Sequence, residues 1–227
     1  MKVSSTKLKY ITFNSRPYES HLLVLSQIAP DSRVLDIGCA TGYFAKELQK
    51  KNCMVWGIEM NPIAANKARK YLEDIFINDV KDIDKLNLKK HFFDYILLLD
   101  VIEHISEIDP IIDALKKYLS KNGRLIISTP NIAHISVRLG LFKGQFNYTQ
   151  TGILDRTHVH FYTRQTLLEL LKKHRYGVEL LDYSADFGTI PKMGRFLRHV
   201  PKIIQFYITK LFPTLLAVQY IVVCSAK

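Results

Sequence analysis

The sequence predicts an α/β protein built on a doubly wound parallel sheet. Strand and helix signals alternate along the first 130 residues with short connections, which is the pattern of repeated strand–helix–strand units. One predicted strand, residues 93–100, is a nearly continuous apolar run and is therefore expected at the centre of the sheet. A glycine loop joins the first strand to the helix after it, and such loops are typical of folds that bind a nucleotide-like ligand.

Up to residue 130, the predicted strands lie at residues 33–37, 54–59, 74–78, 93–100 and 124–129. The helices between them are predicted at residues 43–51, from residue 62 onward, and at 109–119. Pro62 suits the first turn of its helix, because the N–H that proline lacks has no partner there in any helix. Asn122 and Gly123 predict a turn between the last of these helices and the fifth strand.

The second part of the chain departs from this regular alternation. Loops are predicted at residues 131–162, a helix at 163–175, and strands at 178–183 and 216–224. Thr163 is the expected N-cap of the helix, since its hydroxyl can accept from a backbone N–H of the first turn. A basic segment at about 187–213 separates the last two strands, and a minimal sheet would not need it.

The composition is that of an ordinary globular protein, with 48% hydrophobic and 23% charged residues among 227. We therefore predict a single domain, residues 1–227, with a helical insertion at about 187–213. No segment has the roughly 18 uncharged apolar residues that span a bilayer, and the first residues lack the apolar run of a secretory signal. Cys39, Cys53 and Cys224 have no CxxC spacing, so we expect buried thiols in a reducing cytoplasm.

Positive charge is concentrated at the end of the chain. The net charge is +11, and no acidic residue follows Asp186. The last 41 residues therefore carry +6 of that charge. A basic segment of this kind indicates an anionic surface or ligand, although basic surfaces also serve solubility.

The glycine loop and the strand after it form the most specific pattern in the sequence. Gly38 lets the backbone approach a ligand closely, and the amides at the start of the following helix face that ligand. Glu59 ends the next strand, 21 residues after Gly38. A carboxylate at that place can accept hydrogen bonds from both hydroxyls of a ribose. The combination predicts a site for an adenosine cofactor.

The spacing within the loop distinguishes between two such cofactors. Dinucleotide-binding loops follow GxGxxG, because a pyrophosphate must rest on the helix start. Here the pattern is Asp36-x-Gly38-x-x-x-Gly42. The carboxylate of Asp36 would repel a pyrophosphate but suits a ligand with an ammonium and a sulfonium group. This favours S-adenosylmethionine over a nicotinamide dinucleotide.

These residues resemble motif I of class I S-adenosylmethionine-dependent methyltransferases. Further segments resemble the later motifs of that family: residues 57–61, 78–80, 93–104 and 119–131. Residues 130–163 are similar to one bacterial subgroup, whose members resemble ubiquinone-pathway O-methyltransferases and are often encoded beside, or fused to, glycosyltransferases. The resemblance covers about residues 18–183 and the last strand. Ala40 departs from it, because many relatives have glycine there, and its methyl group should narrow the loop slightly.

The resemblance implies a Rossmann-like sheet of seven strands, mostly parallel, with an antiparallel last strand. It also implies O-methylation of a small molecule, a sugar or a lipid-linked precursor, as in glycan biosynthesis. The cofactor would be S-adenosylmethionine, bound by residues on the motifs: Asp36, Gly38, Cys39, Ala40, Gly42, Glu59, Met60, Asn61, Asp79, Val80, Asp100 and Val101. Two other classes stay open, namely a non-catalytic cofactor-binding or interaction protein and a nicotinamide-dependent dehydrogenase.

Methyl transfer to a hydroxyl group needs a base near neutral pH, and histidine is the natural one. We predict His158 as this base and Asp155 as the carboxylate that orients it. The alternative is a structural histidine that orders its loop. His134 and His160 are weaker candidates.

A metal site is the alternative use of the residues after the fourth strand. Asp100 and Glu103 can share a face if the chain is helical there, and His104 adds an imidazole, so a divalent ion would suit the set. The resembling ubiquinone-pathway enzymes place a magnesium-type site at corresponding positions. We expect no metal, with Asp100 lining the cofactor pocket and Glu103 and His104 capping the next helix.

Nucleic acid is not expected as the acceptor. Amino-methylating nucleic-acid enzymes of this fold need an Asn/Asp-Pro-Pro-aromatic run after the fourth strand, where this chain has Asp100, Val101 and Ile102. No cysteine follows a proline, as a cytosine C5 enzyme would require.

The basic segment predicts two short helices, at residues 191–200 and 201–212, with Pro213 ending the second. One face of the second helix is apolar: Ile203, Ile204, Tyr207, Ile208, Leu211 and Phe212. This face could pack as a helical hairpin over the acceptor pocket or against a second subunit in a homodimer. It could instead make a peripheral membrane contact, with nearby basic residues at anionic headgroups.

Overall fold

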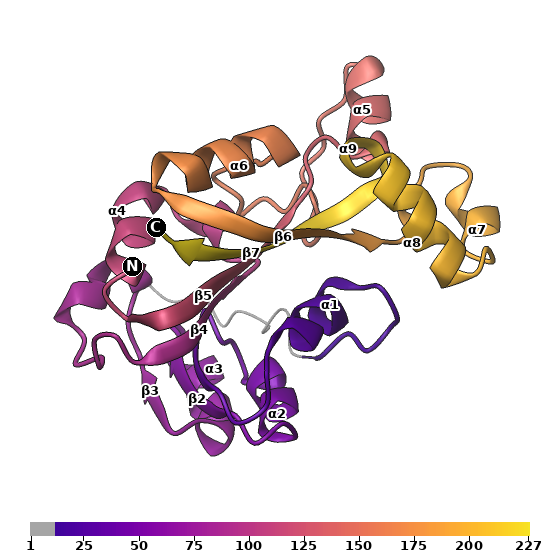
Figure 1. The fold of residues 1–227 in the computed structure, drawn as a ribbon. Helices are drawn as coiled ribbons and strands as arrows, with labels where there is room; N and C mark the ends of the chain where they lie inside the picture. Colours follow the sequence, from indigo (N-terminus) through magenta and orange to yellow (C-terminus); the bar gives the residue numbers. More distant parts are fainter. Residues whose placement is uncertain (1–11) are drawn as a thin grey trace.

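The computed structural model describes residues 12–227, and its centre is one seven-stranded sheet (Figure 1). The strands are β1 Arg33–Ile37, β2 Met54–Ile58, β3 Asp74–Phe76, β4 Phe93–Leu99, β5 Leu119–Pro130, β6 Tyr176–Ala185 and β7 Ala217–Ala226. Their order is β3-β2-β1-β4-β5-β7-β6. Only β7 runs against its neighbours, because it pairs antiparallel with both β5 and β6. The predicted mostly parallel sheet with an antiparallel last strand is confirmed.

Helices cover both faces of this sheet (Figure 1). The α-helices are α1 Ser20–Gln27, α2 Tyr43–Gln49, α3 Pro62–Ala68, α4 Ile108–Leu115, α5 Ile135–Phe142, α6 Arg164–Lys173, α7 Gly194–Leu197, α8 Lys202–Leu211 and α9 Pro213–Leu216. Short 3-10 turns are η1 Arg69–Tyr71, η2 Val80–Lys85, η3 Ile102–His104 and η4 Phe187–Thr189. Helices α1, α2 and α3 lie on one face, and α4 and α6 lie on the other.

The alternation of side chains along the central strands produces two cores, one on each face. Leu35 of β1 and Ile96 of β4 belong to the core under α4 and α6. Val34 and Leu97, one residue away in each strand, belong to the core under α1 and α2. Both faces are buried because successive side chains of a strand point to opposite sides. The prediction that β4 is central is therefore confirmed.

Some predicted boundaries are wrong, and each has a local reason. The helix expected at 109–119 ends at Leu115, and β5 already begins at Leu119. The expected turn at Asn122 and Gly123 is instead a bulge within β5, where the pairing with β4 shifts register. Pro213 does not only end α8, since it also occupies the first turn of α9, where proline needs no N–H partner.

The two helices expected in the basic segment are present as the shorter α7 and α8, whereas two other helices were not indicated by the sequence. Helix α5 lies within the region expected to be loops, and α1 precedes the first predicted strand. Thr163 does cap α6, because its Oγ1 accepts from the N–H of Thr166 at 3.2 Å. Within the described residues, the helices are all too short or too polar to traverse a lipid bilayer.

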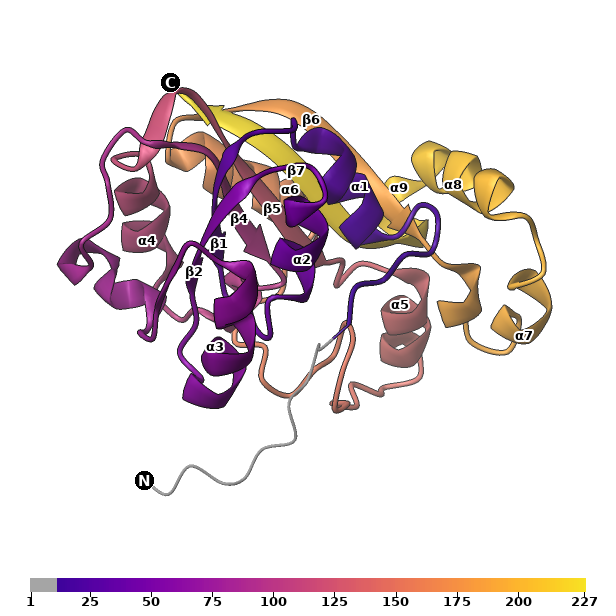
Figure 2. The same cartoon turned by 90° about the horizontal axis from the view of Figure 1, so that it is seen from below.

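The strand directions bring several loops to one edge of the sheet. Strands β1, β2, β4 and β5 all end at this edge, which is called the carboxyl edge below. Strand β6 ends there too, because Ala185 pairs with Ala217 at the start of β7. Pro130 pairs with Gln219 at the same level. Helices α5, α7, α8 and α9 consequently gather at one end of the molecule, as the two ribbon views show (Figures 1 and 2).

Asn131 ties this end of the molecule together. Its side chain is fully buried, and its Nδ2 donates to the carbonyls of Thr214 at 3.1 Å and Ala217 at 2.8 Å. Its Oδ1 accepts from the N–H of Ala133 at 2.8 Å. One amide thus joins the end of β5 to the α9–β7 junction, more than 80 residues later in the chain.

Replacing Asn131 with alanine should destabilise the protein markedly. The change removes the hydrogen-bond partner of one buried and two partly buried backbone groups, and the loss costs about 1–3 kcal/mol where the group stays buried. We expect a lower midpoint of denaturant unfolding, and faster amide exchange around residues 131–134 and 214–217. Asn122→Ala, at an exposed position of the opposite edge, is the matched control and should change neither. Unaltered exchange in Asn131→Ala would contradict this anchoring role.

Candidate active site at the carboxyl edge

The loop between β1 and α2 has the backbone geometry that close approach of a ligand requires. Gly38 and Gly42 have φ of +72° and +74°, in the left-handed region that favours glycine. A Cβ on Gly38 would lie 2.7 Å from Cγ2 of Val101, in the segment after β4. A Cβ on Gly42 would lie 2.9 Å from Cα of Ala68 in α3. Both glycines are thus required by packing across the carboxyl edge as well as by their φ angles.

Ala40 also adopts a left-handed conformation, with φ of +47°. An alanine in this region costs more than glycine would, because its Cβ crowds the backbone. Ala40 thus strains the backbone of the loop, whereas the expected narrowing of the loop by its methyl group stays a prediction. The loop is held nonetheless, because the Ala40 N–H donates to Oε2 of Glu59 at 3.0 Å.

Glu59 fixes the relation between the glycine loop and the end of β2. Besides the bond from Ala40, its Oε1 accepts from the N–H of Asn61 at 2.7 Å. Asn61 in turn caps α3, since its Oδ1 accepts from the N–H groups of Ile63 and Ala64. A carboxylate has about four acceptor positions. The two backbone bonds therefore leave capacity for hydroxyl donors such as those of a ribose.

Asp36 is a carboxyl group buried at the end of β1. Its side chain is 3% exposed, and Oδ2 has no hydrogen-bond partner among the described residues. Burial, and secondarily the negative charge of Glu59, raises the pKa of Asp36 to about 7. A buried, unsatisfied carboxylate is stabilised by a cation. The charge and position of Asp36 thus fit an ammonium or sulfonium group beside the glycine loop.

The other predicted cofactor residues are placed unequally. The side chain of Cys39 is buried against Ala65 and Ala68 of α3. Only the backbone of Cys39 can therefore contact a ligand at the glycine loop. Val80 belongs to the core. Asp79 caps η2 by accepting from the N–H of Lys81, and Met60 is 70% exposed.

Asp100 follows β4 directly and also has a positive φ, +55°. Its Oδ1 accepts from Nε2 of Gln219 at 2.6 Å and from Oγ of Ser128 at 3.4 Å. Burial raises the pKa of Asp100. Gln219 and Ser128 were not predicted as site residues. No local signal points to Gln219, since it reaches Asp100 only through the antiparallel β7.

The loop that contains His158 folds against η3. The backbone N–H groups of Val159 and His160 both donate to the carbonyl of Glu103, at 2.9 and 3.1 Å. The ring of His158 is buried, with its centroid 4.8 Å from that of His104. Nδ1 of His158 lies 3.1 Å from the carbonyl oxygen of Ile153. In the neutral ring this contact assigns the proton to Nδ1 and the lone pair to Nε2.

Asp155 organises the same loop. It is fully buried, and its Oδ1 accepts from both the N–H and the hydroxyl of Thr157, at 2.9 and 2.8 Å. Its carbonyl accepts from the N–H of His158 at 3.0 Å. Asp155 therefore fixes the backbone that carries His158.

Three potential metal ligands gather where these segments meet. Ligand atoms of Glu103, His104 and His158 lie within 4.8 Å of one another. Asp100 is not part of this group, so His158 takes the third place that the sequence assigned to Asp100. Oε2 of Glu103 accepts from Thr129 at 3.1 Å, whereas its buried Oε1 lacks a hydrogen-bond partner among the described residues. One carboxylate and two imidazoles are a suitable donor set for a divalent ion.

A shallow cavity of about 330 Å³ lies beyond these residues on the same edge. It is lined by α5, the 149–154 loop, η4 and β7: Ser136, Val137, Thr149, Thr151, Gly152, Ile153, Leu154, Thr189 and Val218. His134 lies beside it but is fully buried, and its Nδ1 accepts from the N–H of Ser136, which caps α5. Burial lowers the pKa of His134 to about 4. These contacts indicate a structural histidine.

Comparison with known proteins identifies a family. A family model described as "Methyltransferase domain" matches residues 10–182. A ubiquinone biosynthesis O-methyltransferase of Glaesserella parasuis serovar 5 is 33% identical over 44% of this chain and 45% of its own length. The corresponding protein of Pelagibacter ubique is 28% identical over 66% of this chain and 63% of its own length. The chain thus spans about half to just under two thirds of these relatives.

Solved structures show the same fold. A SAM-dependent methyltransferase from Archaeoglobus fulgidus superposes with a TM-score of 0.63 at 17% identity, covering 90% of this chain and 94% of the other. A SAM-dependent methyltransferase from Thermotoga maritima, described as a possible histamine N-methyltransferase, gives 0.63 at 16% identity, covering 92% and 89%.

The raised pKa of Asp36 predicts that, without cofactor, ionisation of this carboxyl group lowers the free energy of unfolding as the pH rises. The folded pKa of about 7 exceeds the unfolded value of about 4, so this group stabilises the fold fully only below about pH 4. The contribution is lost as the pH rises to 7. Asp36→Asn should therefore raise the free energy of unfolding at pH 8, by roughly 1 kcal/mol or more, and raise it less at pH 5.

Asp94→Asn is the matched control for this measurement by denaturant unfolding. The Arg33 guanidinium hydrogen-bonded to Asp94 lowers the pKa of that carboxyl, so the control should lose stability at pH 8. A loss of stability at pH 8 in Asp36→Asn would show that its carboxylate is satisfied in the folded protein.

Proposed function

Because the chain belongs to the methyltransferase domain family, we propose that it transfers a methyl group from S-adenosylmethionine to a hydroxyl oxygen. The acceptor is a small molecule, a sugar or a lipid-linked precursor, as in glycan biosynthesis. The chain belongs to the methyltransferase domain family, and it has the fold of the SAM-dependent methyltransferase from Archaeoglobus fulgidus. The O-methylation is supported by the curated relatives, which are ubiquinone biosynthesis O-methyltransferases.

The main support for this proposal is that two carboxyl groups lie at the ends of the adjacent strands β1 and β2. Asp36 ends the β1 side with an unsatisfied buried oxygen, and Glu59 ends the β2 side with hydrogen-bonding capacity to spare. When bound, S-adenosylmethionine supplies a methyl group made electrophilic by the sulfonium. In our proposal Glu59 holds the ribose hydroxyls, while Asp36 offsets the positive charge. The remaining predicted contacts, including Asp79 near the adenine and Asp100 and Val101 beside Gly38, complete this proposal.

The same arrangement argues against a dehydrogenase. A pyrophosphate placed on the glycine loop would face Asp36, whose buried position offers no compensating cation among the described residues. A non-catalytic cofactor-binding protein would also use the two carboxylates, but it would need no base. An active methyltransferase differs from it because labelled methyl groups leave the cofactor.

His158 is proposed as the group that takes the proton from the acceptor hydroxyl. Its loop covers the carboxyl edge, and Asp155 and Glu103 fix the backbone on either side of it. The contact of Nδ1 with Ile153 favours the tautomer in which Nε2 can accept a proton. The apolar-lined cavity at Ile153 and Leu154 is the proposed place for the acceptor.

A divalent ion is an alternative to this base. Glu103, His104 and His158 would hold it, and it would orient the acceptor hydroxyl and lower its pKa. We propose that the reaction proceeds without a metal ion. We further propose that the acceptor is not a nucleic acid and that the protein acts in the cytoplasm. The buried, free thiols of Cys39, Cys53 and Cys224 support a reducing environment.

Loss of the Glu59 carboxylate should weaken cofactor binding. Glu59→Gln replaces a charged acceptor by a neutral amide, and the loss of such a bond costs about 1–3 kcal/mol, or roughly 5- to 150-fold in the dissociation constant. Calorimetric titration with S-adenosylmethionine measures this change. Glu73→Gln, at an exposed position nearby, should bind as the unaltered protein does. Equal affinity of both variants would refute the proposed ribose site.

Loss of the His158 imidazole should lower turnover while leaving cofactor affinity unchanged. We expect His158→Ala to transfer labelled methyl groups roughly 100-fold more slowly, as for a lost general base. His160→Ala is the control, because its Nε2 contacts the carbonyl of Ser106 on the other side of the loop.

Chelation separates the base from the metal ligand. Activity of the unaltered protein should survive exhaustive treatment with EDTA. Activity that disappears and returns with a divalent ion would make His158 a ligand together with Glu103 and His104. Collapse of cofactor binding in His158→Ala would instead indicate a structural role.

A further inference from the structure

Helix α8 buries polar residues as well as the apolar Phe206 and leaves several large apolar side chains exposed. Its buried residues include Gln205 and Thr209, which are fully buried although both are polar. Ile204, Tyr207 and Leu211 face outward, with exposed fractions of 46%, 61% and 74%. An amphipathic helix on a protein surface normally buries its apolar face. The apolar face of α8 is therefore not packed over the acceptor pocket in this structure, while packing against a second subunit stays a prediction.

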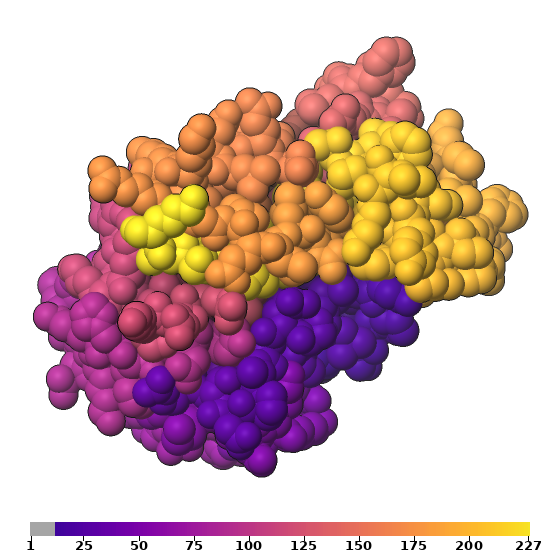
Figure 3. Space-filling model, viewed as in Figure 1, coloured from indigo at the N-terminus to yellow at the C-terminus, as the bar shows by residue number. Residues whose placement is uncertain are grey.

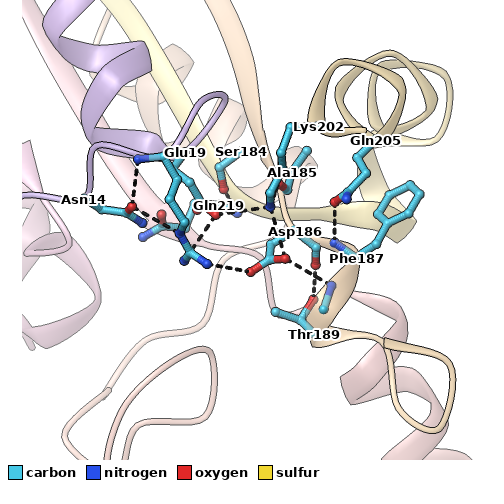
Figure 4. A network of polar contacts seen from close by, with 12 residues as sticks. Asn14, Glu19, Ser184, Ala185, Asp186, Phe187, Thr189, Lys202, Gln205 and Gln219 are labelled. Atoms are coloured by element: carbon cyan, nitrogen blue, oxygen red, sulfur yellow. Dashed lines mark hydrogen bonds and ion pairs between the residues drawn. The ribbon is translucent and has the colours of Figure 1, made fainter. Parts of the chain in front are cut away.

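Specific contacts keep the polar face inward. Oε1 of Gln205 accepts from the N–H of Phe187 at 2.9 Å, and its Nε2 donates to the carbonyl of Val200 at 2.7 Å. Nζ of Lys202 donates to the carbonyl of Ala185 at 3.2 Å (Figure 4). Rotation of the helix would leave these buried groups without partners.

Tyr18 and Glu19, in the segment just before α1, also hold the helix in place. Lys202 forms ion pairs with Asp186 at 3.2 Å and with Glu19 at 3.6 Å (Figure 4). The ring of Tyr18 stacks on Phe206 with centroids 4.5 Å apart. The outward apolar face is thus fixed by the fold.

The exposed apolar residues of this lobe extend beyond α8. We call the set formed by α7, α8 and the residues beside them the α7–α8 surface: Met193, Phe196, Ile203, Ile204, Tyr207, Leu211 and Phe212. The space-filling view shows residues of this part of the chain as a lobe at one end of the molecule (Figure 3). Helix α5, with Phe142 90% exposed, lies at the same end (Figure 2). Grouped exposed apolar residues of this kind mark an interaction site.

The exposed charged residues between Asp186 and α8 are all basic. Lys192, Arg195 and Arg198 are all exposed, and none of them forms an ion pair with a residue in the 12–227 range. No acidic residue occurs after Asp186. Lys202 and Lys210 also belong to the basic segment but are engaged with Glu19, Asp186 and Asp182, so they support the fold.

We propose that the α7–α8 surface docks on an anionic lipid bilayer. Apolar side chains would enter the headgroup boundary, while Lys192, Arg195 and Arg198 meet the lipid phosphates. A second copy of the chain fits less well, because a two-fold interface places each patch on itself. Two basic patches without an acidic residue would then face each other.

The docked orientation places the candidate active site near the lipid. Helix α9 leads directly into β7, and Gln219 of β7 donates to Asp100 at the end of β4. Helix α8, at ten residues, is about 15 Å long, half of a hydrocarbon layer of about 30 Å, so it would lie along the surface. A lipid-linked acceptor would reach the carboxyl edge from this side. This statement about the acceptor rests on the proposed function, whereas the docking itself does not.

Vesicle sedimentation tests the proposal without measuring turnover. The unaltered chain should bind phosphatidylcholine vesicles that contain phosphatidylglycerol at low salt, and should be released by high salt. Pure phosphatidylcholine should retain much less of it. Replacing Lys192, Arg195 and Arg198 together with glutamine should weaken binding roughly 100-fold, for three charges near an anionic surface.

A second variant and a control complete the experiment. Ile204→Gln with Leu211→Gln removes apolar contact area and should weaken binding roughly tenfold or more. Glutamine at Lys90, Lys121 and Lys172, all exposed at the opposite edge, removes the same charge and should bind as the unaltered chain does. S-adenosylmethionine titration of each variant verifies that the fold is intact, because the changed residues lie outside the proposed cofactor site.

Three outcomes would overturn the proposal. The first is no binding of the unaltered chain to anionic vesicles at low salt. The second is equal binding by the control and the triple variant of Lys192, Arg195 and Arg198. The third is a concentration-dependent dimer in sedimentation velocity that Ile204→Gln with Leu211→Gln dissociates, since this would assign the surface to a second copy.

Discussion

The parallel pairing of β1 with β2 on one side and β4 on the other is the constraint on which the site depends. Parallel strands end at the same edge, so this pairing brings the segments after the three strands together. Packing then selects the residues, since Gly38 touches Val101 and Gly42 touches α3. The result is a tightly packed junction of the segments after the strands, beside which the carboxyl groups of Asp36, Glu59 and Asp100 lie.

Those carboxyl groups make the site electrostatically costly before a ligand binds. Asp36, Asp100 and Glu103 are all buried enough that their pKa values rise. The fold carries this cost because Asp36 lies at the end of β1, Asp100 lies directly after β4, and Glu103 lies in the turn η3 that follows, while the strands themselves form the core. Such groups are expected at functional sites, where a bound cation offsets the desolvation. In the binding mechanism we propose, the Asp36 carboxylate lowers the stability of the free protein, and a positively charged ligand offsets this loss when it binds.

The antiparallel β7 determines how the carboxyl edge is extended. Because β7 begins where β5 ends, the segment before it must return to the active-site edge. Asn131 and Gln219 fix that return by hydrogen bonds to groups far away in the chain. The basic segment at this point forms a lobe next to the site. Gln205 holds its helix α8 by hydrogen bonds to Phe187 and Val200, while several large apolar residues of the helix face outward. The topology thus joins a proposed lipid contact to a proposed methyl acceptor site.

The sequence by itself determined the sheet, the glycine loop and the paired carboxylates. These features depend on local patterns: apolar runs, a left-handed glycine, and a fixed spacing between Asp36 and Glu59. Element ends were less predictable, as the bulge at Asn122 shows, because strand pairing outweighed a turn signal. Only the tertiary structure decided that His158 joins Glu103 and His104, that Gln219 holds Asp100, and that the apolar face of α8 points outward. Each of these depends on contacts between residues far apart in the chain, and no local periodicity records which partner a side chain will meet.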